Sequence, residues 1–348
     1  MSLSTPSSRS LTPLVFLVRH ASSSPSPAPD FSRLPGARTP KVAVEKPPRA
    51  LRMPTHDAAR SALSHCVELV KKHDRASYLA TLLMPEKAQP HIFALLAANV
   101  EIALTRDKVS SVSTTAMYRL KFWRDALAAI YKGEGLVPQQ PVATALVAFG
   151  RSSSFDLLDL MAAARQRTIG DRPFNSMNDV YAYGRDSTGS LLRLQAAALR
   201  HARGADADET TTATDAAIDR LAEAHAALTL VRSAGPFTLR RVVLLPEEIL
   251  IGEGLTPDNV VSGKNPEKLQ TAVKRLVELG SSRLADSRSL RGSIPRWIRP
   301  SLWATASQCD HVIKTATAAK YEIRSPLLQR PRPLLAWRLL GWRITGGY

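Results

Sequence analysis

The sequence predicts an all-α bundle over residues 53–348, preceded by a disordered leader over residues 1–52. From residue 57 onward, apolar residues recur every three to four positions, the spacing that gathers them on one face of a helix. No segment alternates convincingly between apolar and polar residues as a half-buried strand would. Internal repeats are also absent from the sequence, so we expect one helical domain behind the leader.

The expected helices follow this periodicity in chain order. Residues 58–84 carry an apolar stripe that includes Cys66 and Val70, and Pro85 ends the helix. Residues 91–107 are apolar nearly all round, which is typical of a helix at the centre of a bundle. The remaining helices are expected over residues 114–133, 141–154, 156–169, 177–204, 214–234, 266–290 and 299–323.

The leader has the composition of a mitochondrial import segment. It contains eight Lys or Arg, ten Ser and nine Pro, and its only acids are Asp30 and Glu45. Such a segment cannot bury enough apolar surface to fold, and an Arg-rich, Ser-rich, acid-poor start is typical of a transit peptide. We expect the mature protein to begin between Ser32 and Met53; a disordered tail without a targeting role is the alternative.

The rest of the composition argues against several functional classes. The apolar run at residues 14–18 is far too short to span a bilayer. Cys66 and Cys309 are the only cysteines, which leaves neither a disulfide framework nor a paired-cysteine zinc site. The net charge of +17 would attract any polyanion, but no nucleotide-binding loop or nucleic-acid recognition pattern accompanies it. We therefore expect no nucleic-acid partner, no cofactor and no metal.

Four segments, at residues 77–107, 118–131, 181–199 and 228–250, carry a family resemblance. In this order and spacing they resemble the squalene and phytoene synthase family, and the similarity extends over residues 61–290. The resemblance implies an isoprenoid-synthase-like helical bundle. It also implies two aspartate-rich motifs on facing helices, because carboxylates at i and i+4 share a helix face and can hold Mg²⁺ against a diphosphate.

The first of these motifs, DDxxD, falls on residues 103–107 and is degenerate. Ala103 and Leu104 stand where the family has acids, and only Asp107 keeps one. A shifted register would bring Glu101 into the motif but would lose Asp107.

The second motif falls on residues 232–246 and has lost all of its acids. Ser233, Pro236 and Phe237 occupy the acidic positions. A hydroxyl and an aromatic ring cannot replace the hard carboxylate ligands that Mg²⁺ needs. The two motifs together predict a pseudoenzyme with no catalytic residue and no metal site.

One branch of that family has lost its acids in the same way and helps to assemble respiratory complex I, the mitochondrial NADH:ubiquinone oxidoreductase. This chain resembles that branch at residues 93–110, 117–131 and 240–246. The resemblance implies a non-catalytic protein at the matrix face of the inner membrane, with complex I assembly intermediates or other assembly factors as partners. A protein that binds a prenyl or other lipid, and a residual prenyltransferase with atypical Mg²⁺ ligands, are the alternatives.

The C-terminal region combines basic residues with tryptophan. From residue 283 onward there are twelve Lys or Arg against three acids, and four of the five Trp of the chain lie here. Trp at headgroup depth beside basic side chains is typical of a membrane interface. We therefore expect the segment 331–348 to contact the membrane peripherally; packing of the Trp inside the bundle, or a basic surface for an acidic partner, are the alternatives. The candidate contacts are Trp337, Arg338, Trp342 and Arg343.

Overall fold

A computed structural model describes residues 53–107, 113–204 and 212–348. The expected import segment, residues 1–52, lies outside the described residues, as do residues 108–112 and 205–211. Within the described ranges every regular element is a helix and no strand occurs, which confirms the predicted all-α class.

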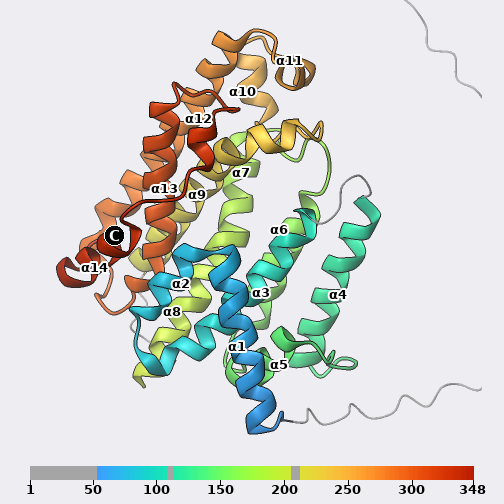
Figure 1. Cartoon of the computed structure of the whole chain (residues 1–348), viewed down its shortest axis with the longest axis vertical. Helices are drawn as coiled ribbons and strands as arrows, with labels where there is room; N and C mark the ends of the chain where they lie inside the picture. Colours follow the sequence, from blue (N-terminus) through green and yellow to red (C-terminus); the bar gives the residue numbers. More distant parts are fainter. Residues whose placement is uncertain (1–52, 108–112, 205–211) are drawn as a thin grey trace, which may run out of the picture. The chain divides into compact units, whose positions relative to one another are not determined.

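Figure 1 shows how these helices follow one another through the bundle. The α-helices are α1 (His56–His73), α2 (Arg75–Leu82), α3 (Gln89–Asp107), α4 (Ser113–Tyr131), α5 (Pro141–Phe149), α6 (Phe155–Arg167), α7 (Met177–Gly184), α8 (Ser190–Arg203), α9 (Thr212–Thr238), α10 (Glu247–Gly252), α11 (Pro257–Ser262), α12 (Pro266–Ser289), α13 (Pro300–Ala318) and α14 (Leu335–Thr345). Three short 3₁₀ turns, η2 (Glu86–Ala88), η5 (Leu290–Ser293) and η6 (Pro326–Gln329), join some of them, and a π-helical turn, η3 (Arg185–Gly189), links α7 to α8.

The structure divides the first expected helix in two. Asp74 ends α1 in a non-helical conformation and begins α2, where its carboxylate accepts hydrogen bonds from the backbone N–H and the hydroxyl of Ser77. An aspartate at this position satisfies donors that the start of a helix leaves unpaired. Periodicity alone did not predict the break between α1 and α2, because a capping aspartate resembles any polar residue on the exposed side of a helix.

The long helix α9 is the centre of one half of the bundle, where it packs against α7, α12 and α13 (Figure 1). Small residues bring these helices close together. A Cβ atom added to Gly184 of α7 would lie 2.6 Å from the carbonyl oxygen of Ala222, and one added to Gly280 of α12 would lie 2.8 Å from Cγ of Leu228. Glycine is therefore required at both crossings, because a side chain would collide with α9.

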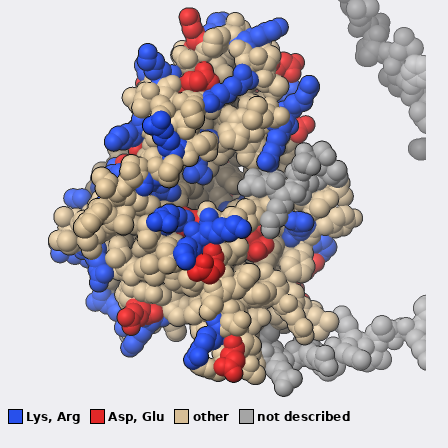
Figure 2. All heavy atoms as spheres, viewed as in Figure 1, with Lys and Arg blue, Asp and Glu red and all other residues tan. Residues whose placement is uncertain are grey.

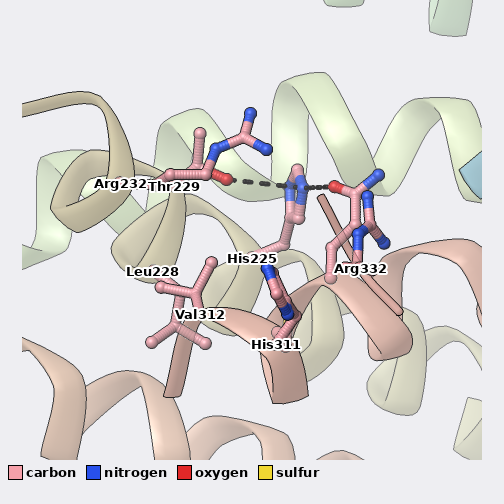
Figure 3. A pocket seen from close by; sticks show the side chains of 9 residues that line it. His225, Leu228, Thr229, Arg232, His311, Val312 and Arg332 are labelled. Atoms are coloured by element: carbon pink, nitrogen blue, oxygen red, sulfur yellow. Dashed lines mark hydrogen bonds between the residues drawn. The ribbon is translucent and has the colours of Figure 1, made fainter. Parts of the chain in front are cut away.

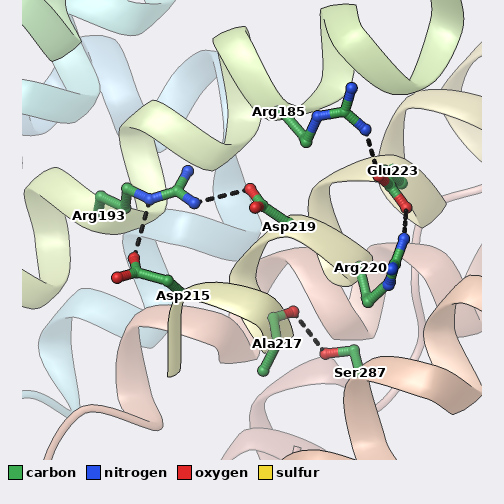
Figure 4. Close-up of polar contacts among 8 residues, drawn as sticks. All are labelled: Arg185, Arg193, Asp215, Ala217, Asp219, Arg220, Glu223 and Ser287. Atoms are coloured by element: carbon green, nitrogen blue, oxygen red, sulfur yellow. Dashed lines mark hydrogen bonds and ion pairs between the residues drawn. The ribbon is translucent and has the colours of Figure 1, made fainter. Parts of the chain in front are cut away.

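A buried carboxylate ties three of these elements together. Glu223 of α9 has a side chain only 2% exposed, and three guanidinium groups surround it: Arg185 at 2.5 Å, Arg220 at 2.9 Å and Arg283 at 3.3 Å. Figure 4 shows Glu223 between Arg185 and Arg220. A buried charge is tolerated only when it is paired, so this cluster fixes α9 against η3 and α12.

The C-terminal residues are part of the packed structure. Helix α14 lies near the C-terminus (Figure 1) and packs against α13 and α2. The ring of Tyr348 is buried. The Tyr348 hydroxyl donates to the backbone oxygen of Ser287, and the Trp303 indole donates to the backbone oxygen of Gly347. No helix in the described ranges is both long and apolar enough to cross a membrane.

Candidate functional site

A large cavity opens within the helical bundle, and α3 and α9 both contribute to its wall. It has a volume of about 830 Å³, within the range of pockets that hold small molecules. Its walls come from the α1–α2 junction, from α3, α4, α6, α9 and α13, and from the chain between η6 and α14. Figure 2 shows the molecule hollowed near the middle of one face, with Lys and Arg side chains beside the hollow.

The two degenerate motifs meet at this cavity. Ala103 and Leu104 of α3 line it, and so do Ser233 and Phe237 of α9. The structure therefore brings together four of the positions that the sequence singled out. The side chain of the fifth, Asp107, lies outside what the structure describes, although its backbone forms the last residue of α3.

Glu101, the acid that a shifted register would place in the first motif, is not among the described residues of the cavity wall. It lies instead near the Cys66 thiol of α1. Burial, together with the Glu101 charge, raises the pKa of this thiol to about 12. The register with Ala103 and Leu104 at the motif positions is therefore the one that faces the cavity.

Asp74 is the one acid among the described residues that line the cavity. Its carboxylate is already occupied, because it caps α2 through Ser77 and accepts a 3.4 Å hydrogen bond from the side-chain amide of Gln308. No group of three or more potential metal ligands occurs anywhere in the described part of the chain. The described wall thus offers none of the clustered carboxylates that Mg²⁺ prefers.

Positive charge, in contrast, is concentrated on the wall. Six Lys or Arg side chains line the cavity, and in the described structure none of them forms an ion pair with a carboxylate. They are Lys72, Arg75, Arg165, Arg232, Arg330 and Arg332. The six residues come from separate segments and no sequence motif joins them, so the sequence did not predict this cluster. Only Arg232 had a signal, as the first residue of the second motif.

Two of these guanidinium groups are held in poorly hydrated surroundings. Arg165 of α6 donates to the Asn99 side-chain oxygen at 2.7 Å and to the backbone oxygen of Met161 at 2.9 Å, both of which are neutral. Arg332 donates to the Ser307 hydroxyl at 3.2 Å. Burial lowers the pKa of both guanidinium groups, because removal from water disfavours the charged form.

A smaller chamber opens beside the same wall, between α9, α13 and the segment after η6 (Figure 3). His225 lies at its centre, where Nε2 is 2.8 Å from the Gln308 side-chain oxygen and Nδ1 is 3.0 Å from the Thr188 hydroxyl. Since an amide oxygen only accepts, Nε2 carries a proton and donates it to Gln308. Burial lowers the pKa of His225 to about 4, and the Arg232 charge acts in the same direction.

The four candidate membrane contacts differ in their surroundings. Trp337 and Arg343 are exposed on α14. Arg338 instead forms an ion pair with Asp310 at 2.5 Å, and its guanidinium lies 4.9 Å from the centre of the half-buried Trp342 ring. Arg338 and Trp342 therefore belong to the face of α14 that packs on the bundle.

The chain is similar to known proteins in both sequence and fold. A sequence model of squalene/phytoene synthases matches residues 70–338. The chain belongs to the squalene/phytoene synthase family. The resemblance inferred from the sequence is thereby confirmed.

Relatives within this family carry the name of a complex I assembly factor. "NADH dehydrogenase (ubiquinone) complex I, assembly factor 6" of Mus musculus is 27% identical over 285 residues, which cover 80% of this chain and 81% of the relative. The Homo sapiens protein of the same name is 26% identical over 287 residues, covering 81% of this chain and 82% of the relative.

Solved structures of family members share the fold. A dehydrosqualene synthase in complex with ligand has a TM-score of 0.69 at 15% identity and covers 83% of this chain and 97% of its own. Squalene synthase HpnC from Alicyclobacillus acidocaldarius has a TM-score of 0.62 at 15% identity and covers 77% and 97%. At this identity the likeness concerns the isoprenoid-synthase-like bundle, which agrees with the predicted fold.

Proposed function

We propose that this protein is a non-catalytic member of the squalene/phytoene synthase family that acts in the assembly of respiratory complex I. The observation that carries the proposal is the meeting of Ala103 and Leu104 with Ser233 and Phe237 at one cavity. In the family pattern these four positions carry carboxylates that hold Mg²⁺, and none of the four side chains here is a carboxylate. The names of the mouse and human relatives support the assembly role.

The proposed location is the matrix side of the mitochondrial inner membrane. The Arg-rich, Ser-rich composition of residues 1–52 supports import, and complex I assembly takes place in this organelle. Helix α14 supports a peripheral contact with the membrane, because Trp337 and Ile344 are 71% and 79% exposed on the side away from the buried Leu339.

The assembly role can be tested by depleting the protein from cells and resolving their respiratory complexes on native gels. We expect complex I to fall while the other respiratory complexes persist, and re-expression of the full chain to restore it. A variant that carries the substitutions Ser233→Ala and Phe237→Leu should restore assembly equally well, because the proposal gives these positions no catalytic part. Normal complex I levels after depletion would contradict the assembly role.

Lipid binding is a second candidate function, and it is compatible with the first. The cavity remains about 830 Å³ in volume although its metal-binding positions are lost. Much of its wall is apolar, including Ile102, Leu120 and Leu230. A closed core would have filled this space, so the open cavity favours a bound apolar or amphiphilic molecule.

A further inference from the structure

Four arginines gather at one corner of the bundle, and none of them lines the cavity described above. They come from the C-terminal end of α8 (Arg203), from η5 (Arg291) and from the turn that leads into α13 (Arg296 and Arg299). The first three side chains are exposed, and that of Arg299 is half-buried. We call these four residues the arginine corner.

The side chains of the arginine corner lie close to one another. A Cβ atom added to Gly346, which ends α14, would lie 3.4 Å from Nη1 of Arg299 and 3.6 Å from Nε of Arg296, so both guanidinium groups reach the same point. Burial lowers the pKa of Arg299, and the charges of Arg296 and Arg291 act in the same direction. The corner therefore concentrates like charges that repel one another.

Local contacts hold two of these guanidinium groups in place without neutralising them. Arg299 donates to the backbone oxygens of Ile294 at 3.0 Å and Gly346 at 2.7 Å. The guanidinium of Arg203 lies 5.5 Å from the centre of the Trp297 ring, within the range of a cation–π contact. All of these partners are uncharged, so they fix the positions of the arginines and leave their charge in place.

None of the four arginines forms an ion pair with a carboxylate of the described residues. Acids of the adjoining helices are engaged elsewhere: Asp286 of α12 pairs with Arg283 at 3.7 Å, and Asp310 of α13 pairs with Arg288 at 2.7 Å. Within the described part of the chain the corner thus keeps its positive charge.

The place of the arginine corner at the start of α13 adds to its positive potential. The first turn of this helix contains no acid, and no side chain caps its N-terminus. A helix N-terminus carries a partial positive charge and favours acids, yet Arg296 and Arg299 put cations there. This arrangement is unfavourable for α13 alone and becomes favourable when an anionic group joins the site.

A carboxylate-bearing protein surface suits this corner better than a membrane does. The planar guanidinium fork matches the two oxygens of a carboxylate, and the contacts described above hold the forks in fixed positions. None of the exposed large hydrophobic side chains of the described structure lies between residues 290 and 303. The corner therefore offers no apolar group for insertion into a bilayer, unlike α14, where Trp337 and Ile344 are exposed.

We propose that the arginine corner binds an acidic segment of a partner protein, whose carboxylates form ion pairs with Arg203, Arg296 and Arg299. This inference rests on the proposed assembly role and adds the place where a partner docks and the charge of its surface. Carboxylates spaced along one segment can reach the whole corner, and each ion pair relieves the repulsion among the arginines. Exposed charges also steer the partner toward the corner, so binding weakens as the salt concentration rises.

Fluorescence anisotropy with the purified full chain tests the docking site directly. The probe is a fluorescein-labelled peptide of four Glu-Glu-Ala repeats, and its control is the same peptide with Gln in place of Glu. We expect the acidic peptide to bind at least about tenfold more tightly than the neutral one, because only carboxylates form ion pairs with guanidinium groups. The measurement needs no complex I, so its outcome is separate from that of the depletion experiment on the assembly role.

A triple variant of the corner shows whether the peptide binds there. The substitutions Arg203→Gln, Arg291→Gln and Arg296→Gln change only exposed side chains. They keep Arg299, whose hydrogen bonds to the backbone support the fold. We expect this variant to bind the acidic peptide at least about tenfold more weakly, since three weak ion pairs together amount to about one order of magnitude in affinity.

A matched variant controls for the large positive charge of the whole chain. The substitutions Arg60→Gln, Arg119→Gln and Arg275→Gln remove the same charge from exposed side chains of α1, α4 and α12. We expect the affinity for the acidic peptide to change less than about twofold, because charges outside the site act only through screened attraction.

Each other outcome overturns the proposal. Equal losses in the two triple variants would show general charge attraction without a site, and equal affinity for the neutral peptide would remove the role of carboxylates. A corner variant that loses binding to anionic vesicles but keeps the peptide would assign the corner to a membrane. Peptide binding that appears only after Asp206→Asn, Asp208→Asn and Glu209→Gln would assign it to acids of the chain itself, and no binding by any variant would refute the site.

Discussion

Ala103 of α3 and Ser233 of α9 line the same cavity, although they lie far apart in the chain. In the family pattern both positions carry carboxylates, whereas here Ala103 has no ligand atom and Ser233 offers only a hydroxyl. Under the proposed function, the scaffold can persist without the chemistry, because the packing of the bundle holds both helices whichever side chains face the cavity.

We predict that the purified protein does not convert farnesyl or geranylgeranyl diphosphate when Mg²⁺ is supplied. Ionising an allylic diphosphate requires metal ions that neutralise the leaving group, and the described wall has no free carboxylate to hold them. The double substitution Ser233→Asp and Phe237→Asp should also be inactive, because Ala103 and Leu104 would still lack acids. Analysis of extracted products by mass spectrometry, with a squalene synthase as the positive control, checks both; condensation product from the native chain would contradict the prediction.

Substitution by alanine is expected to change the stability of the protein in opposite directions at two glycines. Gly184 lies at the close crossing of α7 and α9, and Gly341 lies in open space on α14. Gly184→Ala should destabilise the protein by about 1–3 kcal/mol, because the added Cβ would meet the backbone of Ala222 at 2.6 Å. Gly341→Ala, on α14, has no neighbour within 4 Å and should stabilise the protein by up to about 1 kcal/mol through helix propensity. Urea unfolding of both variants measures the two signs, and a neutral Gly184→Ala would show that the crossing can adjust.

Sequence periodicity predicted the positions of the long helices well, because a buried stripe repeats along the chain itself. Helix α6, expected over residues 156–169, spans Phe155–Arg167, and α12, expected over residues 266–290, spans Pro266–Ser289. Ala103 and Ser233 were singled out because the family pattern fixes their spacing, and both line the cavity. These are local or nearly local signals.

The charges of the cavity could not be predicted in this way. Arg165, Arg232 and Arg332 come from α6, α9 and the segment after η6, and only the fold brings them to one wall. None of these three arginines forms an ion pair with a carboxylate of the described residues, and this too depends on how the fold places them. The break at Asp74 was missed for a different reason, because a capping aspartate resembles any polar residue on the exposed side of a helix.

One buried histidine, His91, and one half-buried histidine, His225, predict that the protein loses stability in mild acid. Burial lowers the pKa of both His91 and His225 to about 4, whereas an unfolded chain has values near 6.5. Because the folded values are the lower ones, stability is fully present above about pH 6.5, and it falls as the pH drops toward 4 and the unfolded state takes up protons first. At pH 5 the loss is about 2 kcal/mol for each histidine.

The free energy of unfolding, measured in urea at pH 7 and at pH 5, checks this effect. His225→Asn should reduce the difference between the two pH values by about 2 kcal/mol, because asparagine does not titrate in this range. A His91→Asn variant should give a similar reduction, and the two should add, since the residues lie on different helices. An unchanged pH difference in both variants would mean that neither histidine is kept neutral by the fold.

The exposed face of α14 predicts binding to anionic membranes. Trp337, Leu340 and Ile344 follow one another at helical spacing and are exposed, whereas Leu335 and Leu339 on the opposite side are buried in the bundle. Arg343 lies on the exposed surface near them and can approach lipid phosphates. We therefore expect the full chain to sediment with cardiolipin-containing vesicles and to be released by salt.

Point substitutions are the appropriate test of this surface, because deleting residues 331–348 would also remove buried Leu339 and Tyr348 and part of the cavity wall. The double substitution Trp337→Ser and Ile344→Ser should reduce vesicle binding at least about tenfold, since each side chain loses its burial in lipid. Leu136→Ser combined with Ile251→Ser removes side chains that are 78% and 72% exposed outside α14 and serves as the matched control. Equal sedimentation of the two double variants, or binding to neutral vesicles as strong as to anionic ones, would refute a membrane contact through α14.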